Sequence, residues 1–540
     1  MKMKGINVKI IKFCNKYIRN ERKKVYLYTI ISLFISLLSL GSTLITGKFV
    51  DTLIDNKNLI LVKRYCIAFA IISLIIIIFS LIKNYLYTLI QTKSAYQINK
   101  DVIEHIKKLP RKEYIEMNSS YFNQRINNDS NSIISFYLDV IVEPLTNIIS
   151  GIVSITIIFV INKKIAAILI LSCILYIVLY KIFRNKLYTS NYIYKEEQAE
   201  YFSKLNEQLE YIDFIKLHSL NRYFLSRLEN IFIKFFATIK KYSKISIVFS
   251  GLDQIICVVA EILIYIFMAI DILNGKVSIG MFTIVMNYCG NSLQCIKYFL
   301  SFGKIYQENL VAYDRIDIIL KKPIQKEGDY ILKEINEIEI NNLSYNIADR
   351  IILNKMHITM EKGKIYLIKG ENGTGKTTCI RILMGMYSDE YSGEIKFNGI
   401  NIKNVNMCEA RKKNISITEQ DATLINDTVL NNLRLLNLEL QEKDIKEIAK
   451  FLNLKPRIDT NIFENNTNIS GGERQKIAVC RQLLSNTEVM IFDEPTSAMD
   501  KESRKKMVQL MNLYKKDRII IVISHDIEFD NIADEIITLE

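Results

Sequence analysis

The chain has 540 residues, a formal net charge of +14, nine cysteines and no tryptophan. This length is too great for a single hydrophobic core, so two or more domains are expected. The basic balance suits nucleic acid or a membrane protein with cytoplasmic lysines, but no nucleic-acid-binding motif is found, so nucleic acid is not expected as a partner. The cysteines form neither a C-x-x-C pair nor a His/Cys cluster, so neither a structural metal centre nor a disulfide framework is predicted.

Long apolar runs are confined to the first three hundred residues. A helix of about 20 apolar residues is long enough to cross the hydrocarbon core of a bilayer. We therefore predict an all-α transmembrane domain over residues 1–320 with six membrane-spanning helices. The predicted spans are Val25–Gly47, Tyr65–Ile82, Pro144–Ile161, Ile165–Tyr180, Ile245–Ile270 and Val277–Ile296.

The distribution of Lys and Arg predicts the orientation of these spans. The basic residues are concentrated before the first span and in the segments 83–143 and 181–244. The positive-inside rule then places the N-terminus, both segments and the C-terminal half of the chain in the cytoplasm of a multi-pass cell-membrane protein. The two long segments are expected to continue the span helices beyond the bilayer and to reverse through short breaks.

Two groups of polar residues stand out within the last two predicted spans. Asn287, Asn291 and Gln294 follow i, i+4, i+7 spacing, so they share one helix face, and Asp253 and Glu261 lie in the preceding span. Carboxylates inside a membrane are costly and are usually functional or paired. The five residues are candidates for a substrate pathway that favours a peptide or a cationic compound. The alternatives are helix–helix hydrogen bonds for the amides and a structural pair for the acids.

A different pattern begins after a linker at residues 321–335. Residues 336–540 read as an α/β domain, in which Gly370-x4-Gly375-Lys376-Thr377 lies between an apolar strand and an amphipathic helix. This is the P-loop pattern, whose backbone N–H groups surround phosphates. Lys376 would reach the outer phosphates of ATP, and the Thr377 hydroxyl would hold Mg²⁺. The predicted loop comprises Gly370, Glu371, Asn372, Gly373, Thr374, Gly375, Lys376, Thr377 and Thr378.

Polar residues follow three other predicted strands. Asp493 and Glu494 end a buried apolar run, which places them at the ligand edge of a parallel sheet. Asp493 would complete the Mg²⁺ shell, and Glu494 would polarise the attacking water. His525 follows a second such strand, at the position of a γ-phosphate sensor, and Gln420 follows a third.

A second glycine-rich turn opens a basic, helix-forming run at Ser470, Gly471, Gly472 and Glu473. The N-terminus of a helix is suited to bind an anion. One phosphate site is already assigned to the P-loop, so the second turn raises the question of which phosphate it contacts.

The order of these motifs resembles that of the ABC transporter ATPases. The matching positions are Tyr345, the P-loop, Gln420, the signature Ser470-Gly471-Gly472-Glu473, the acidic strand, Asp500 and His525. The resemblance implies that Tyr345 stacks on adenine and that Gln420 senses Mg²⁺ and relays to the membrane domain. It also implies that His525 contacts the γ-phosphate and that Asp500 contacts the opposite ATP site.

In this family the signature binds ATP held by the other nucleotide domain. The chain has one P-loop and one signature, so the resemblance implies a dimer with two shared ATP sites, formed with a second copy or with a homologous half-transporter. The stretch before the signature departs from the family pattern. Glu464 matches the usual acid, but Phe463 and Asn466 replace glycines.

The membrane half is similar to the six-span exporters of the same family, with Asp129, Ile215 and Lys216 at matching positions. We therefore expect a multidomain protein in which six transmembrane helices precede an α/β P-loop ATPase domain. The expected function is ATP-driven export of a peptide or a small amphipathic or cationic compound, with ATP and Mg²⁺ as cofactors. Alternatives are a lipid or drug exporter, half of a heterodimer, a soluble ABC ATPase, and an ATP-gated membrane protein without transport.

Overall fold

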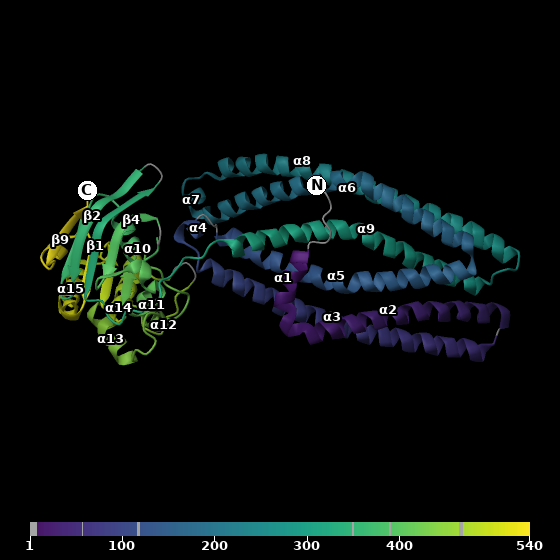
Figure 1. Cartoon of the computed structure of the whole chain (residues 1–540), viewed down its shortest axis with the longest axis horizontal. Helices are drawn as coiled ribbons and strands as arrows, with labels where there is room; N and C mark the ends of the chain where they lie inside the picture. Colours follow the sequence, from purple (N-terminus) through teal and green to yellow (C-terminus); the bar gives the residue numbers. More distant parts are fainter. Residues whose placement is uncertain are drawn as a thin grey trace. The chain divides into compact units, whose positions relative to one another are not determined.

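The structure, a computed structural model, describes residues 8–56, 58–115, 119–347, 350–387, 390–463 and 468–539. It divides into two compact units (Figure 1). The first unit comprises Met1–Lys107 and Met117–Lys322, and the second comprises Lys108–Glu116 and Pro323–Glu540. The short segment around residues 108–116, which we expected within the transmembrane domain, therefore packs with the second unit.

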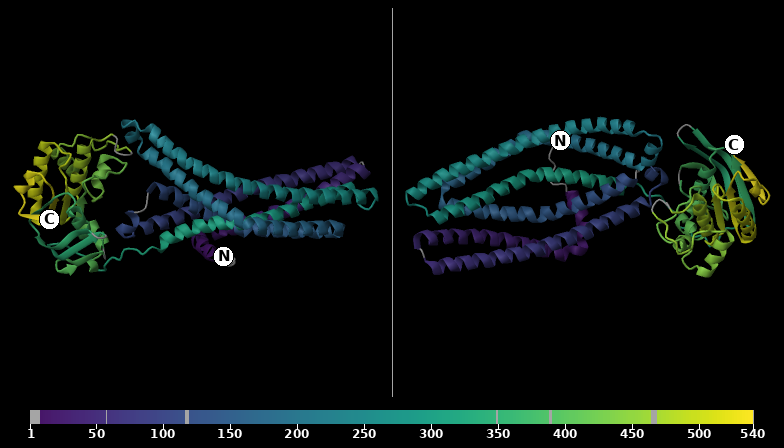
Figure 2. Two further views of the ribbon diagram at one scale, coloured as in Figure 1. Left: turned by 90° about the horizontal axis from the view of Figure 1, so that it is seen from above. Right: turned by 180° about the vertical axis from the view of Figure 1, so that it is seen from behind.

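Long helices build the first unit (Figures 1 and 2). The first five predicted spans lie within five of them, and the sixth, Val277–Ile296, begins two residues before α9. The expected cytoplasmic extensions continue the same helices. The helices are α1 (Val8–Ile18), α2 (Arg22–Asp51), α3 (Leu59–Ile106), α5 (Ser119–Ile161), α6 (Lys163–Glu210), α7 (Ile212–Leu217), α8 (Asn221–Leu273) and α9 (Ile279–Lys321).

Five helical stretches among the described residues are long and apolar enough to cross a membrane, and they contain the first five predicted spans. They are Lys9–Ile54, Leu59–Ile106, Ile126–Ile161, Lys163–Glu210 and Asn221–Leu273. The predicted sixth span lies in α9, which is not among them, and its amides Asn287, Asn291 and Gln294 make that region less apolar. The sixth span stays a prediction.

Polar caps fix where the long helices begin. The Asn58 side chain accepts a hydrogen bond from the Ile60 N–H at 3.0 Å before α3, and Asn162 accepts one from Lys164 at 2.9 Å before α6. Side-chain oxygens at an N-cap satisfy backbone N–H groups that lack a partner within the helix. These caps allow tight reversals between helices that have almost no connecting loop.

Helix α9 packs against α2 at one end through a close backbone contact. A Cβ atom on Gly280 would lie 2.1 Å from the carbonyl oxygen of Gly47, so a larger residue cannot occupy this position without moving a helix. The Asp51 carboxylate accepts hydrogen bonds from the Ser278 hydroxyl at 2.8 Å and from the Gly280 N–H at 2.6 Å. Asp51 thereby caps the first turn of α9 from a neighbouring helix.

The two helices α6 and α8 form a long antiparallel pair (Figures 1 and 2). Tyr176 of α6 is fully buried, and its hydroxyl donates to the Asp253 carbonyl oxygen at 3.1 Å. Farther along the pair, Tyr194 stacks against Phe235 and Tyr242 with ring centroids 5.8 and 5.5 Å apart. Aromatic rings therefore supply the contact over the part of the pair that extends beyond the predicted spans.

The second unit contains two sheets. A five-stranded parallel sheet has the order β6-β7-β8-β3-β9, and a four-stranded antiparallel sheet has the order β2-β1-β4-β5. The strands are β1 (Glu337–Ile347), β2 (Arg350–Glu361), β3 (Ile365–Gly370), β4 (Tyr391–Phe397), β5 (Ile400–Asn401), β6 (Ile415–Thr418), β7 (Val489–Asp493), β8 (Ile519–Ile523) and β9 (Glu535–Leu539).

Helices cover both faces of the parallel sheet. They are α10 (Lys376–Leu383), α11 (Met407–Lys413), α12 (Val429–Arg434), α13 (Glu442–Phe451), α14 (Gly471–Leu483), α15 (Lys501–Tyr514) and α16 (Ile527–Asp530). Helix α4 (Arg111–Ile115) belongs to the same unit. Because both faces are covered, β7 and β8 are buried at every position and are almost continuously apolar.

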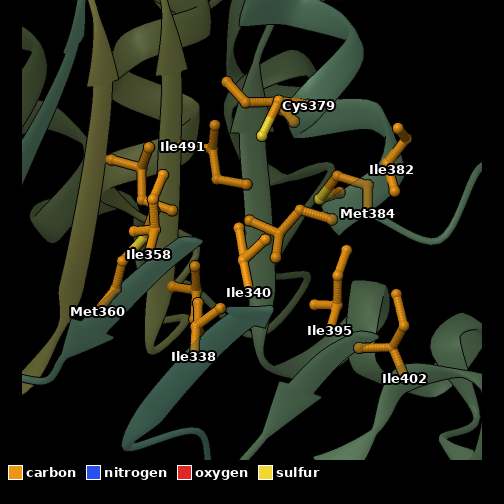
Figure 3. Close-up of a cluster of buried hydrophobic side chains, with 14 of the residues drawn as sticks. Ile338, Ile340, Ile358, Met360, Cys379, Ile382, Met384, Ile395, Ile402 and Ile491 are labelled. Carbon is orange, nitrogen blue, oxygen red and sulfur yellow. The ribbon is translucent and has the colours of Figure 1, made fainter. Parts of the chain in front are cut away.

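Two hydrophobic cores lie on opposite faces of the parallel sheet. Side chains alternate along a strand, so Ile491 enters the core shared with the antiparallel sheet and α10, while Phe492 enters the core under α12 to α15. Figure 3 shows Ile491 in the first core with Ile340 of β1 and Cys379 of α10. The two cores hold the strand ends of the parallel sheet in fixed positions.

The ion pair between α5 and α9 provides a test of the first unit. Arg315 of α9 donates from Nε to Asp129 Oδ2 at 2.9 Å and from Nη2 to the other oxygen, and Asp129 is 5% exposed. Removing one partner of a fully buried pair costs about 3–5 kcal/mol, but the Arg315 side chain is 35% exposed, so we expect about 2 kcal/mol for Asp129→Ala. Thermal unfolding in detergent measures the loss.

Asp317→Ala is the matched control, because Asp317 pairs with Lys321 on the same helix and the Lys321 side chain is 67% exposed. Removal of that pair should change the unfolding temperature little. An equal shift for both variants would show that the Asp129–Arg315 pair does not stabilise the α5–α9 contact.

Candidate functional site

Four parallel strands bring the predicted site residues to one sheet edge. β3, β6, β7 and β8 run parallel to their neighbours, so their carboxyl ends all lie at the same edge. The residues that follow these ends are the P-loop, Gln420, Glu494 and His525. The parallel strand order therefore brings these motifs together at one edge of the sheet, as we expected from the sequence.

The P-loop has backbone conformations that favour glycine. Gly373 and Gly375 have φ angles of +91° and +87°. A Cβ on Gly375 would lie 2.9 Å from the Ile352 carbonyl oxygen, so the loop also needs glycine there for space. Gly375 directly precedes α10 and exposes the helix N-terminus to the loop. Glu371, Asn372 and Gly373 are exposed around the loop, while Thr374 and Thr378 are half-buried.

Lys376 lies inside this loop. It is 8% exposed, and its ammonium group donates to the carbonyl oxygens of Gly370 and, at 2.9 Å, of Glu371. A buried ammonium group needs such partners because desolvation disfavours an isolated charge. The two carbonyl groups therefore hold the cation where it can exchange them for the oxygens of an anion.

Thr377 and Asp493 are in direct contact although they come from different elements. The Thr377 hydroxyl donates to Asp493 Oδ2 at 2.9 Å, and Asp493 is 4% exposed. Burial raises the pKa of Asp493 above its usual value, and the hydrogen bond from Thr377 opposes that rise. A hydroxyl and a carboxylate at this distance form a set of hard oxygen ligands of the kind that Mg²⁺ prefers.

Glu494 is held in an uncommon backbone conformation. Its φ angle is +46°, which is unfavourable for a residue with a side chain. Its N–H donates to the Ile523 carbonyl oxygen at 2.9 Å, and its own carbonyl oxygen accepts from Gln475 Nε2 at 2.8 Å. These bonds to β8 and α14 fix the start of the turn that carries the carboxylate.

His525 and Gln420 lie at the same edge with exposed side chains. Across the part of the chain that the structure describes, neither side chain has a hydrogen-bond partner within the protein. Both are thus available to a ligand at the mouth of the P-loop, and their predicted contacts with the γ-phosphate and Mg²⁺ stay predictions.

The signature turn begins α14 with a capping box. The Ser470 hydroxyl accepts from the Glu473 N–H at 3.3 Å, and Glu473 Oε2 accepts from the Ser470 N–H at 3.1 Å. Glu473 therefore has a local role in fixing the start of this helix. Ser470 and Gly471 are exposed, which leaves this helix N-terminus open to an external anion.

Asp500 is engaged within its own domain. One oxygen accepts from the Ser503 N–H at 2.9 Å and caps α15, and the other accepts from Lys476 Nζ at 2.7 Å. The hydrogen bond from Lys476, which is 5% exposed, holds the pKa of Asp500 well below its usual value. The implied contact of Asp500 with the opposite ATP site stays a prediction.

Tyr345 lies on β1 with its ring covered. It is 6% exposed, and its ring centroid lies 5.3 Å from that of Tyr387. Burial is the main cause that raises the pKa of its hydroxyl. Stacking on adenine would require that one ring face become accessible, so this role also stays a prediction. In the stretch before the signature, Phe463 is 59% exposed, and Glu464 and Asn466 lie outside the described residues.

Two of the candidate pathway residues have defined partners in the structure. Asp253 lies 3.9 Å from Lys297 Nζ of α9, so its charged partner is a lysine, whereas we considered a pairing with Glu261. Asn287 donates to the Thr283 carbonyl oxygen of its own helix at 3.0 Å. Asn287 and Gln294 are exposed, and Asn291 and Glu261 are half-buried. Within the described residues, the three amides make no hydrogen bond to another helix, so they mark an open face of α9.

Sequence motifs missed two residues near the nucleotide edge. Arg350 of β2 places Nη2 3.7 Å from the position of a Cβ on Gly373, so a guanidinium lies beside the P-loop. Gln475 of α14 is 3% exposed and bonds to the turn that begins at Glu494. Each residue reaches the site through a contact with another element of the fold. The spacing of neither residue from the sequence motifs predicts that contact.

Comparison with known proteins identifies both halves of the chain. The family described as "ABC transporter" matches residues 353–497, and that described as "ABC transporter transmembrane region" matches residues 25–293. An export ATP-binding/permease protein of Rickettsia conorii is 26% identical over 558 residues, covering 99% of this chain and 95% of that protein.

Two other relatives align over a shorter region. The ATP-dependent lipid A-core flippase of Haemophilus influenzae is 30% identical over 304 residues, covering 53% of this chain and 51% of the flippase. A flippase with the same description from Francisella tularensis is 31% identical over 258 residues, covering 46% and 42%. The chain thus matches about half the length of these flippases.

The fold has a close counterpart among solved structures. A bacterial Atm1-family ABC exporter with ATP bound superposes with a TM-score of 0.83, covering 97% of this chain and 94% of that one. At 17% sequence identity the likeness concerns the fold alone. It confirms the predicted fold class, helical membrane domain first and α/β domain second. With both regions matched in this order, the chain belongs to the ABC transporter family and carries its transmembrane and ATP-binding regions on one polypeptide.

Proposed function

We propose that this chain is half of an ATP-driven exporter that hydrolyses ATP at the carboxyl edge of its parallel sheet. The observation that carries the proposal is the contact of Thr377 with Asp493 at 2.9 Å, directly beside the buried ammonium of Lys376. A pair of oxygen ligands and a cation beside a loop of the P-loop pattern support this proposal. Among the described residues, five helical stretches able to cross a membrane precede it in the same chain.

The residues at this edge would have separate roles in phosphoryl transfer. Lys376 would leave the Gly370 and Glu371 carbonyl oxygens to bind phosphate oxygens. Thr377 and Asp493 would hold Mg²⁺, which neutralises phosphate charge when it is bound. Glu494, half-buried beside them, would orient and polarise the attacking water. Such catalysis depends mainly on positioning and charge stabilisation, because the protein has little covalent chemistry to perform.

We infer that two chains form the working unit. Ser470 and Gly471 present an exposed helix N-terminus, which suits the γ-phosphate of an ATP held by a second chain. The short helix α7, at the tip between α6 and α8, exposes Phe214 by 50% and Leu217 by 82%. Exposed apolar groups of this kind are typical of docking surfaces. The proposed partner is a second copy of the chain, and a homologous half-transporter is the alternative.

The proposed orientation places the N-terminus and the ATP-binding domain in the cytoplasm of a cell-membrane protein. The basic residues before the first span and in the two long inner segments support this orientation. Helix α1 packs Ile10, Cys14 and Ile18 inside the protein and leaves Lys12 and Lys16 exposed, so basic side chains ahead of the first span are accessible.

For the substrate, we propose a peptide or a small amphipathic or cationic compound that passes along the open face of α9. The amides Asn287, Asn291 and Gln294 support this pathway because they are not used to join helices. A lipid is the second candidate. Two observations favour it: the flippases among the relatives, and the pairing of Asp253 with Lys297, which reduces the negative charge available to a cation.

The first prediction concerns Glu494. Replacement by Gln keeps the shape of the side chain and removes its ability to polarise water, so phosphate release should fall about 100-fold or more while ATP still binds. Glu502→Gln, an exposed site on α15 paired with Lys506, is the control and should leave both quantities unchanged. Phosphate release and nucleotide binding measure the two effects. Wild-type turnover in Glu494→Gln would exclude this carboxylate as the general base.

The second prediction tests the dimer. The chain purified alone in nanodiscs should hydrolyse ATP, and Ser470→Arg should abolish that activity because the larger side chain blocks the site of the partner's phosphate. ATP binding to the P-loop should persist in this variant. If the wild-type chain folds and binds ATP but has no activity alone, two identical chains do not complete each other's sites, and the homodimer is contradicted.

The third prediction concerns the pathway. Glu261 is a half-buried acid for which no ion pair is found among the described residues, so Glu261→Gln should change the stimulation of ATP turnover by a cationic substrate several-fold. Basal turnover should remain as in the wild type. Unchanged stimulation by cationic peptides, together with stimulation by phospholipid, would favour the lipid candidate.

A further inference from the structure

The turn between β7 and α15, residues 494–500, is bound to α14 by one buried side chain. Gln475 is 3% exposed. Its Nε2 donates to the Glu494 carbonyl oxygen at 2.8 Å and to the Ser497 hydroxyl at 3.1 Å, and its Oε1 accepts from the Ala498 N–H at 2.7 Å. One amide therefore uses both its donor and its acceptor capacity on a single turn.

The same turn is in van der Waals contact with the start of α14. A Cβ on Gly472 would lie 2.6 Å from the Ala498 carbonyl oxygen, so there is no room between the helix and the turn. The next turns of α14 are fully packed, with Ile477, Val479 and Cys480 buried completely. A shift of the Ser470 end of the helix must therefore displace the turn, because packed interiors do not deform continuously.

The turn is also bound to the loop that carries His525. The Thr496 hydroxyl donates to Asp526 Oδ2 at 2.6 Å, and Arg504 lies 3.3 Å from the other oxygen of Asp526. Glu494 begins the turn at a φ angle of +46°, so the direction of its carboxylate depends on the bonds that hold its backbone. The Gln475 amide makes one of those bonds at the Glu494 carbonyl group.

We propose that Gln475 is a positioning residue that couples the two ATP sites of the dimer. The inference rests on the proposed function, in which Ser470 contacts the partner's ATP while Glu494 acts on ATP in its own chain. When the N-terminus of α14 binds the partner's γ-phosphate, Gln475 passes the shift of the helix to the backbone of Glu494. Each ATP thereby sets the position of the general base at the other site, and hydrolysis becomes cooperative.

If Gln475 had only a structural role, its replacement would lower stability without changing cooperativity. A second buried glutamine of α14 provides a matched control for this alternative. Gln482 also lies on α14 and is 0% exposed. Its Nε2 donates to the carbonyl oxygens of Ser416 at 3.2 Å and Ile491 at 2.8 Å, so it bonds to strands and not to the turn. Replacing either glutamine by Leu removes a buried amide of the same size from the same helix.

The experiment measures ATP turnover against ATP concentration for the full chain in nanodiscs. In the wild type we expect a Hill coefficient between one and two. Gln475→Leu should lower it to one and reduce kcat at least tenfold, with ATP binding to the P-loop retained. Gln482→Leu should lower the unfolding temperature and leave the Hill coefficient unchanged. Gln475→Glu, which keeps the acceptor for the Ala498 N–H and loses the donor to Glu494, should resemble Gln475→Leu and serves if the Leu variant does not fold.

The inference alone is overturned by wild-type cooperativity in the Gln475 variants, or by an equal loss of cooperativity in Gln482→Leu. An active wild type with a Hill coefficient of one overturns it as well, because no coupling then exists. A folded wild type without ATPase activity in any lipid would instead contradict the proposed function, and the coupling with it. Fitting kcat and the Hill coefficient separately distinguishes these cases.

Discussion

The nucleotide site depends on the common direction of the strands in one five-stranded sheet. Because β3, β7 and β8 are parallel, Thr377, Asp493 and His525 lie at one edge although almost 150 residues separate the first from the last. The hydrogen bond between Thr377 and Asp493 forms only if β7 is in register with β8 and β8 with β3. The two hydrophobic cores on either face secure that register, so packing far from the site determines its geometry.

Buried polar groups then connect this edge to the rest of the ATP-binding domain. Lys376 donates to loop carbonyl groups, Lys476 pairs with Asp500, and the Gln475 amide is hydrogen-bonded to the turn after β7. Each such group would cost several kcal/mol if it lost its partners, so each contact is strongly specified. The turn at residues 494–500 is bonded to α14 through Gln475, to α15 through Arg504, and to the loop after β8 through Asp526. This turn thus links the signature helix α14 to the backbone of Glu494.

The membrane half uses a different means of specification. Its helices are apolar around much of their surface, so hydrophobicity alone does not select which faces meet. Selection comes from a few close or polar contacts: the approach of Gly280 to Gly47, the cap that Asp51 provides, and the ion pair of Asp129 with Arg315. The amides of α9 take no part in these contacts, and a single chain leaves them open.

The sequence by itself determined the order of the two domains, the first five stretches able to span a membrane, and the P-loop, because these depend on local composition and spacing. It also predicted that Asp493 and Glu494 lie at the carboxyl edge of the parallel sheet, because a carboxylate at the end of a buried strand must lie where the strand leaves the core. Only the tertiary structure decided that Asp253 pairs with Lys297, that Asp500 binds Lys476, and that the ring of Tyr345 is covered. Arg350 and Gln475 belong to the same group. Their partners lie on other elements of the chain, and contacts between elements follow from how helices and strands pack, which the spacing of residues along the chain does not encode.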